Sequence, residues 1–274
     1  MFFGMPTLVE LPDLAATVRE AAAQGLDFVE INMSFPQYTA ARLNADEARA
    51  LAEKYGIFYT IHADEALNPF DFNPKVAQCY FGVMRDTIRT ARAIGAKIVN
   101  LHLQKGVYVT LPDQVVLLTD VYRDEYLANV RAFVSACEEE IGGSGVRVAI
   151  ENVDSNPFTE AQIAAFPIFF ASPVFALTLD TGHEHCLGGK DAFAYRDHPD
   201  RLIHMHLHDS DGRHAHLPLG RGSVPLAEKL SLLPENATCL IEVKTVAGLT
   251  ESLAYAASHR LFTLNRKKEN PYAG

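Results

Sequence analysis

The sequence has no tryptophan, no long apolar run and no excess of basic residues, and the last two absences each exclude a class of protein. No stretch approaches the ~20 apolar residues of a membrane-spanning helix. Residues 1–10 lack the basic and apolar regions of a signal peptide. The 34 acidic and 24 basic side chains leave a net charge of −10. Nucleic-acid coat proteins need an excess of Lys and Arg, so nucleic acid is not the favoured partner. Because no apolar run could span a bilayer, a membrane is not favoured either.

Cysteine pairs and a dinucleotide fingerprint are also missing. Cys79, Cys137, Cys186 and Cys239 lie far apart without a C-x-x-C pair. This spacing favours buried thiols in a reducing cytoplasm over a disulfide framework. From the separate cysteines we expect a cytoplasmic protein. In addition, no G-x-G-x-x-G motif follows the first predicted strand, so a dinucleotide-binding sheet lacks its usual signature.

Short β-branched runs alternate with amphipathic stretches along the whole chain. Strands are predicted at 2–5, 26–33, 57–62, 97–103, 146–152, 174–180, 201–209 and 238–244. Helices are predicted at 13–24, 44–55, 74–94, 122–141, 159–170, 225–233 and 249–264. We expect an interruption of the fifth helix near Pro167 and find a poorly patterned segment between Asp180 and Arg201. Strands that alternate with helices imply a parallel sheet.

The number of strand–helix units favours a closed barrel. The 274 residues divided among eight units leave about 34 residues each, the size of one strand–helix repeat. We predict a single α/β domain over residues 1–274, a (β/α)8 TIM barrel, with a loose polar tail at 265–274. An open doubly wound sheet is the alternative, and its fingerprint is absent.

Six consecutive predicted strands carry a potential metal ligand at or near the C-terminal end. These residues are His62, His102, Glu151, Asp180, His206 and Glu242. In a parallel barrel all strand C-termini open onto one face, where active sites of this fold are built. Carboxylates crowded into one mouth repel one another unless a cation neutralises them. A mixed nitrogen and oxygen set suits Zn, Mn, Co or Fe better than Ca, so we predict a divalent metal site there.

Histidines near these strand ends enlarge the set of candidates. Eight of the 11 histidines fall between His183 and His216. His183 follows Asp180 by one turn, and His214 and His216 lie in the loop after the strand at 201–209. Nine candidate ligands are too many for one catalytic ion and would serve two or three ions that share carboxylates.

Together these motifs resemble the xylose isomerase-like TIM-barrel superfamily, from about Leu8 to Leu264. The motifs are Ile61-His62-Ala63, Asn100-Leu101-His102, Ile150-Glu151-Asn152, Leu179-Asp180-Thr181-Gly182-His183, His206-Leu207-His208-Asp209, Leu219-Gly220-Arg221-Gly222 and Ile241-Glu242. The superfamily contains sugar isomerases and epimerases, hydroxypyruvate and inosose enzymes, and abasic-site nucleases of the endonuclease IV type. The resemblance implies the same barrel and a metal-dependent enzyme.

In the single-metal sugar epimerases of the superfamily, a Glu, an Asp, a His and a second Glu hold the ion. The matching residues here are Glu151, Asp180, His206 and Glu242. The resemblance implies that the two glutamates act as acid and base on opposite faces of the substrate. It also implies that His183 and Arg213 contact substrate oxygens. The substrate would then be a small polyhydroxy carbonyl compound, and the ion Zn, Mn or Co.

The endonuclease IV type holds three zinc ions with nine residues, and eight of these have counterparts here. The counterparts are His62, His102, Glu151, Asp180, His183, His206, His216 and Glu242. The ninth is an aspartate, and this sequence has His214 at that position. A neutral imidazole cannot bridge two metal ions or neutralise their positive charge as a carboxylate does, so the third metal site is open to question. Of the alternating His204, His206 and His208, the resemblance selects His206. Between one and three ions are compatible with the pattern.

Three functions stay open at this point. A metal-dependent isomerase or epimerase is favoured, a multinuclear phosphoester hydrolase is the alternative, and a barrel that binds a ligand without catalysis is the third.

Several residues have two interpretations at this stage. Lys105 and Arg221 are further candidates for substrate binding. The Gly220-Arg221-Gly222 segment is either a phosphate-binding loop or a turn. Aromatic residues of two predicted loops, 63–74 and 104–122, either wall a pocket or anchor the loops: Phe70, Phe72, Tyr108 and Tyr122. Dimers and tetramers are common among the proteins that the sequence resembles, so a homo-oligomer is compatible with it.

Overall fold

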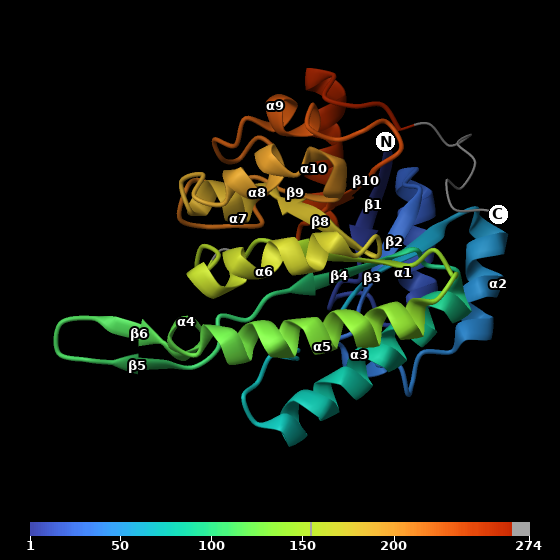
Figure 1. Cartoon of the computed structure of the whole chain (residues 1–274). Coiled ribbons are helices and arrows are strands. Elements are labelled where there is room, and N and C mark those ends of the chain that lie inside the picture. Colours follow the sequence, from blue (N-terminus) through green and yellow to red (C-terminus); the bar gives the residue numbers. More distant parts are fainter. Residues whose placement is uncertain (154, 265–274) are drawn as a thin grey trace.

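The chain folds into a closed barrel of eight parallel strands in the order β1-β10-β9-β8-β7-β4-β3-β2 (Figure 1). The computed structural model describes residues 1–153 and 155–264, so the tail expected at 265–274 lies outside the described residues. The barrel strands are β1 (Phe2–Pro6), β2 (Phe28–Asn32), β3 (Phe58–His62), β4 (Ile98–His102), β7 (Arg147–Glu151), β8 (Phe175–Asp180), β9 (Leu202–Leu207) and β10 (Thr238–Ile241). The predicted (β/α)8 barrel is confirmed.

Helices follow the strands and cover the outside of the barrel (Figure 1). They are α1 (Leu14–Gln24), α2 (Ala45–Tyr55), α3 (Pro74–Ile94), α4 (Leu118–Val121), α5 (Arg123–Ile141), α6 (Glu160–Ala171), α7 (Thr181–Cys186), α8 (Ala192–Asp197), α9 (Leu226–Leu230) and α10 (Val246–His259), with 3-10 turns η1 (Pro36–Tyr38) and η2 (Pro199–Arg201). Side chains cap α1 and α2: Asp13 accepts from the Ala16 N–H, and Asn44 from the N–H groups of the first turn. Among the described helices, none combines the length and hydropathy of a membrane span.

Three sequence expectations about elements are wrong. Pro167 does not interrupt α6, because a capping box at Thr159 and Gln162 starts the helix and its apolar side chains are buried. The last helix begins earlier and ends earlier than expected, because Thr245 caps it and Arg260 takes a left-handed conformation at its end. The predicted loop at 104–122 contains the hairpin β5 (Tyr108–Thr110) and β6 (Val115–Leu117) as well as α4.

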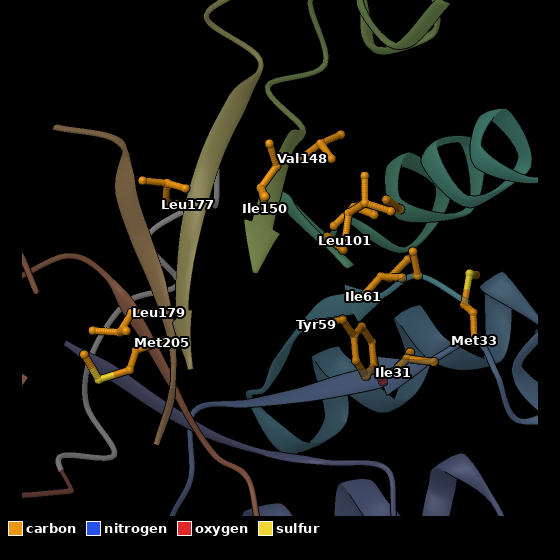
Figure 2. Packing of buried hydrophobic residues seen from close by; sticks show 14 of the residues in the cluster. Ile31, Met33, Tyr59, Ile61, Leu101, Val148, Ile150, Leu177, Leu179 and Met205 are labelled. Atoms are coloured by element: carbon orange, nitrogen blue, oxygen red, sulfur yellow. The ribbon is translucent and has the colours of Figure 1, made fainter. Parts of the chain in front are cut away.

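Alternate residues of each strand face opposite sides of the barrel wall. The side chains that face the helices form one large core cluster, which includes Ile61, Leu101 and Ile150 (Figure 2). A separate small cluster fills the barrel interior near the N-terminal ends of the strands: Phe2, Phe28, Phe58 and Leu240. Gly4 makes room for it, since a Cβ there would lie 2.5 Å from the Phe28 ring.

The barrel interior changes from apolar to polar along the strands. On β2 the inward positions are Phe28, then Glu30; on β3 they are Phe58, Thr60 and His62. On both strands the inward-facing residues are therefore apolar near the N-terminal end and polar near the C-terminal mouth. Apolar side chains close the bottom of the barrel, and buried polar side chains, which need partners or ions, gather at the top.

Candidate metal and catalytic site

The six strand-end residues predicted from the sequence meet at the C-terminal mouth. His62 and His102 end β3 and β4, and Glu151 and Asp180 end β7 and β8. His206 lies within β9, and Glu242 follows the last residue of β10. Burial is nearly complete for Glu151, Asp180 and His206. Closure of the sheet thus brings together residues that lie as far as 180 positions apart.

Four of these residues form one compact group. Glu151, Asp180, His206 and Glu242 each offer one atom, and these atoms lie within 4.8 Å of one another. His206 Nδ1 is 2.9 Å from Glu242 Oε2 and 3.1 Å from Glu151 Oε1. Three buried atoms, His206 Nδ1, His206 Nε2 and Glu242 Oε2, make no hydrogen bond within the described residues. Three carboxylates and one imidazole nitrogen with such unsatisfied atoms are a donor set that fits a divalent transition metal.

Charge compensation dominates this group. Burial opposes ionisation of Glu151, but His206 and His102 outweigh it and hold the pKa of Glu151 well below its usual range. The same holds for the pKa of Glu242, which His206 and Lys244 lower. Burial likewise opposes a charged His206, yet the surrounding carboxylates raise its pKa well above the ordinary value. A proton on His206 thus partly supplies the positive charge that a bound cation would supply.

Glu30 supports His206 from beneath, and the sequence analysis missed it. Glu30 lies on β2, 1% exposed, and its Oε1 is 3.0 Å from His206 Nε2. Its Oε2 is 3.1 Å from His204 Nε2 and accepts a hydrogen bond from Thr60 Oγ1 at 2.8 Å. This ion pair favours a proton on Nε2, the side of the ring away from the metal group, and leaves Nδ1 toward that group. The signal was a glutamate at an inward position of a predicted strand, two residues after Phe28.

A second group lies beside the first and shares Glu151. His62 Nε2 is 3.2 Å from His102 Nε2, and these nitrogens are 3.5 and 3.1 Å from Glu151 Oε2. His62 Nδ1 is held by the Ala63 carbonyl at 2.8 Å, which directs Nε2 into the group. Burial works against a charged His62, but Glu151 raises its pKa to about 9. The three side chains could hold one ion with Glu151 as a bridge.

A third group contains His183, His216 and an unexpected member, His208. His183 Nε2 is 3.4 Å from His216 Nε2. His208 Nε2 is 2.9 Å from Asp180 Oδ2, and its Nδ1 accepts the His216 N–H at 2.8 Å. The His208 ring fits because residue 182 is glycine: a Cβ there would lie 2.1 Å from His208 Cε1. Since Asp180 and His216 occupy both ring nitrogens, His208 would have to break one bond to bind an ion.

The structure does not bring three of the sequence candidates to the mouth. His214 has a side chain 72% exposed and pairs with Asp211 at 2.9 Å. Arg213, in the same loop, is exposed. Arg221 is exposed and pairs with Glu251. His216 reaches the mouth while His214 does not, because His216 has φ +59° and the loop is not extended there.

A cavity of about 360 Å³ opens above the three groups. Its walls include Glu151 and Glu242, and Gln104, Lys105 and Asn156 also line it. Lys105 Nζ is 2.9 Å from Asn156 Oδ1. Lys244 also lines the cavity, with Nζ 2.8 Å from Glu242 Oε1.

The remaining candidate loop residues lie outside the cavity wall. Phe70 is buried among core aromatics, while Phe72, Tyr108 and Tyr122 are exposed. None of these four lines the cavity, whose aromatic wall is Phe158. Gly220 has φ +87°, and its N–H donates to Asp209 Oδ2 at 2.9 Å. The segment around Arg221 is therefore a turn rather than a phosphate loop.

The model of the xylose isomerase-like TIM barrel family matches residues 18–260. The chain belongs to this family. Solved structures with the same fold include a D-tagatose 3-epimerase-like protein at 24% identity, with a TM-score of 0.77 over 95% of this chain and 97% of that one. Another is the 3-keto-D-glucoside 4-epimerase from E. coli, at 16% identity and a TM-score of 0.75 over 96% and 100% of the two chains.

A third fold relative is the IOLI protein with a bound zinc atom, at 17% identity and a TM-score of 0.71 over 95% of this chain and 97% of that one. No curated protein matches the chain in sequence. At these identities the likeness shows the shared barrel.

Proposed function

We propose that this protein is a metal-dependent isomerase or epimerase of a small polyhydroxy carbonyl compound. One observation carries the proposal: Glu151 and Glu242 approach the same nitrogen, His206 Nδ1, from 3.1 and 2.9 Å. Two carboxylates at one metal group, beneath an open cavity, form the acid–base pair that proton transfer next to a carbonyl needs. Several fold relatives are named as ketose epimerases, among them an L-ribulose 3-epimerase.

The chain's own residues would divide the work as follows. Glu151, Asp180, His206 and Glu242 would hold the ion. A bound divalent ion polarises a carbonyl and a neighbouring hydroxyl, which makes the adjacent carbon-bound proton removable. Lys244 holds Glu242 ionised and oriented, so that Glu242 can accept a proton. Asn100 donates to Glu151 Oε2 and orients that carboxylate. One glutamate removes the proton and the other returns one, which for epimerisation takes place on the opposite face.

The cavity suits a monosaccharide-sized ligand. His183 lines the cavity beside the metal group, and Lys105 lines it too, so both can contact substrate oxygens. Arg213 would have to move from its exposed position to do so. We propose Zn, Mn or Co as the ion, one to three per chain. We also propose a cytoplasmic homo-oligomer, a location that fits the four separate thiols.

Solvent exchange at the substrate carbon tests the function. The protein is loaded with Mn, Co or Zn and incubated in D2O with ketoses such as D-tagatose, D-allulose and L-ribulose, and deuterium incorporation is followed by NMR. We expect exchange and epimer formation with at least one ketose. Glu151→Gln and Glu242→Gln should each lower the rate by about 10²- to 10⁴-fold, whereas Glu139→Gln, on the exposed face of α5, should not. No exchange with any metal and ketose would refute the proposal.

A phosphoester hydrolase is the second candidate, and the grouping of His62 and His102 with Glu151 favours it. Clustered ions that share a carboxylate can activate water and stabilise a phosphoryl transition state. Two measurements together separate the two functions: the number of bound ions, by mass spectrometry, and the reaction that the protein catalyses. Two or three ions with hydrolysis of a phosphodiester, abolished by His62→Ala and His102→Ala, would favour the hydrolase. One ion with ketose exchange that survives both substitutions favours the epimerase.

A further inference from the structure

The cavity above the metal group is lined in part by the loops that follow β4 and β7. These two strands pair in parallel, with His102 opposite Glu151 at their C-terminal ends. Lys105 comes three residues after His102, a stretch that spans at most about 11 Å, and Asn156 comes five residues after Glu151. All four residues line the same cavity of about 360 Å³. One ligand can therefore touch the metal group and Lys105 together.

Lys105 is the lysine of this cavity that no carboxylate neutralises within residues 1–153 and 155–264. The other lining lysine, Lys244, has its Nζ 2.8 Å from Glu242 Oε1. Lys105 Nζ instead donates to the neutral amide oxygen of Asn156 at 2.9 Å and lies 5.1 Å from the centre of the Tyr108 ring. Because an ammonium has three N–H donors, Lys105 keeps two donors and an uncompensated charge for a ligand.

The backbone that carries Lys105 is held in place before a ligand arrives. The buried Gln162 side chain donates through Nε2 to the carbonyls of Leu103 and Gln104, at 2.9 and 3.2 Å. The Thr119 hydroxyl donates to the Lys105 carbonyl at 3.2 Å. Binding at Lys105 therefore does not have to order this loop, and less of the interaction energy is lost.

Neutral hydrogen-bond donors line the cavity together with this ammonium. Asn156 presents its amide oxygen to Lys105, so its NH2 group is left to donate to a ligand. Ser155 and Gln104, each next in sequence to one of these two residues, line the cavity as well. An ammonium with neutral donors and no acidic partner is a donor set that binds a carboxylate or a phosphate group.

Charge decides which end of a ligand Lys105 receives. Glu151 and Glu242 lie at the metal group, where their carboxylates repel an anionic group. Arg221 is no alternative, because it pairs with Glu251 and does not line the cavity. We propose that Lys105 holds an anionic end group of the substrate, a carboxylate or a phosphate, and so selects a sugar acid or sugar phosphate over the neutral sugar of the same skeleton. This inference rests on the proposed function, in which the carbonyl end of the same compound lies at the metal group.

Three ligands that differ only at carbon 6 test the proposal. D-Tagatose has a neutral hydroxymethyl group there, D-tagaturonate a carboxylate and D-tagatose 6-phosphate a phosphate. Calorimetric titration of the metal-loaded wild type should show at least one anionic ligand binding at least about tenfold more tightly than D-tagatose, because charge-assisted hydrogen bonds are the strong ones. The tighter of the two anionic ligands identifies the end group.

Substitutions at and near the ammonium locate the effect. Lys105→Gln should remove the advantage of the anionic ligand, and Lys105→Arg, which keeps the charge, should retain most of it. Lys97→Gln is the matched control: Lys97 is also half-buried and donates to a neutral oxygen, the Ser144 carbonyl, at 2.7 Å, but it lies at the N-terminal end of β4 and does not line the cavity. Asn156→Asp places a carboxylate against the ammonium and should also remove the advantage. Unfolding curves show which variants fold, and Asn156→Asp keeps the test decisive should Lys105→Gln fail to fold.

Two outcomes would overturn the proposal. The first is a wild type that binds neither anionic ligand more tightly than D-tagatose. The second is a tenfold advantage that folded Lys105→Gln or Asn156→Asp keeps in full, as Lys97→Gln does, which would place the anion elsewhere, on the metal for example. The readout is binding, so it separates from the proposed reaction. A preference that depends on Lys105, without proton exchange in any of the three ligands, would refute the epimerase and leave the anion subsite standing.

Discussion

Glu30→Gln is the substitution that most directly probes how the barrel interior prepares the metal group. The carboxylate of Glu30 has two acceptor oxygens, one 3.0 Å from His206 Nε2 and one 3.1 Å from His204 Nε2. Glutamine has nearly the same shape but only one acceptor oxygen. At least one imidazole must then lose its acceptor or face an NH2 group. If His206 is affected, the one proton that its ring keeps when it becomes neutral can sit on Nδ1, the nitrogen that the metal needs.

The size of the effect follows from this geometry. His206 is one of the four proposed ligands, and the buried carboxylate of Glu30 lies 3.0 Å from its Nε2. Loss of such an outer partner weakens metal binding by about 10- to 100-fold, or about 1.4 to 2.7 kcal/mol. Thr60→Val removes only the 2.8 Å hydrogen bond to Glu30 Oε2 and keeps both acceptors. We expect less than about threefold for this control.

Calorimetric titration of the metal-free protein with Zn or Mn, or competition with a chelator, measures the affinity without any need for a substrate. We expect the dissociation constant for the metal to be lowest for the wild type, slightly higher for Thr60→Val and highest for Glu30→Gln. An affinity of Glu30→Gln equal to that of the wild type would refute the view that Glu30 sets the orientation and tautomer of His206. Unfolding curves of the metal-free variants show whether a lower affinity reflects a damaged fold.

Three further predictions concern stability. Gly182→Ala puts a Cβ 2.1 Å from the His208 ring, so urea unfolding should show a loss of about 1–3 kcal/mol, and unchanged stability would mean that the ring has room to move. Phe28→Ala empties the apolar end of the barrel, where Phe28 is fully buried, and should lower the unfolding free energy by about 3–5 kcal/mol; a loss below about 1 kcal/mol would contradict this packing. Burial raises the pKa of Asp191 from 3.8 to about 6, so the native state keeps this proton longer than the unfolded state, and the contribution of Asp191 to stability falls as pH rises across that window. Asp191→Asn should remove this component, on the order of 1 kcal/mol between about pH 4 and about pH 7, and identical pH profiles of the two proteins would argue against it.

Local pattern determined the elements and the positions of most candidate ligands. The alternation of β-branched runs with amphipathic stretches predicted the barrel, and helix signals such as Asn44 and Gly56 gave the bounds of α2 to within one residue. Strand-end positions selected His62, Glu151 and Asp180, because all parallel strands end on one face. These features depend on neighbours in sequence or on a rule of the fold. They can therefore be read without coordinates.

Only the tertiary structure decided which residues act together. Glu30 meets His204 across the barrel interior, 174 positions away in sequence, and no periodicity relates the two. Whether His208 or His214 approaches His216 depends on the left-handed backbone at His216 and on the space above Gly182. The hairpin from Tyr108 to Leu117 is an exception, because its two β-branched runs flank a Pro112-Asp113 turn, a local signal that the sequence analysis missed. Long-range closure, loop conformation and free space are properties of packing, so a linear pattern carries no signal for them.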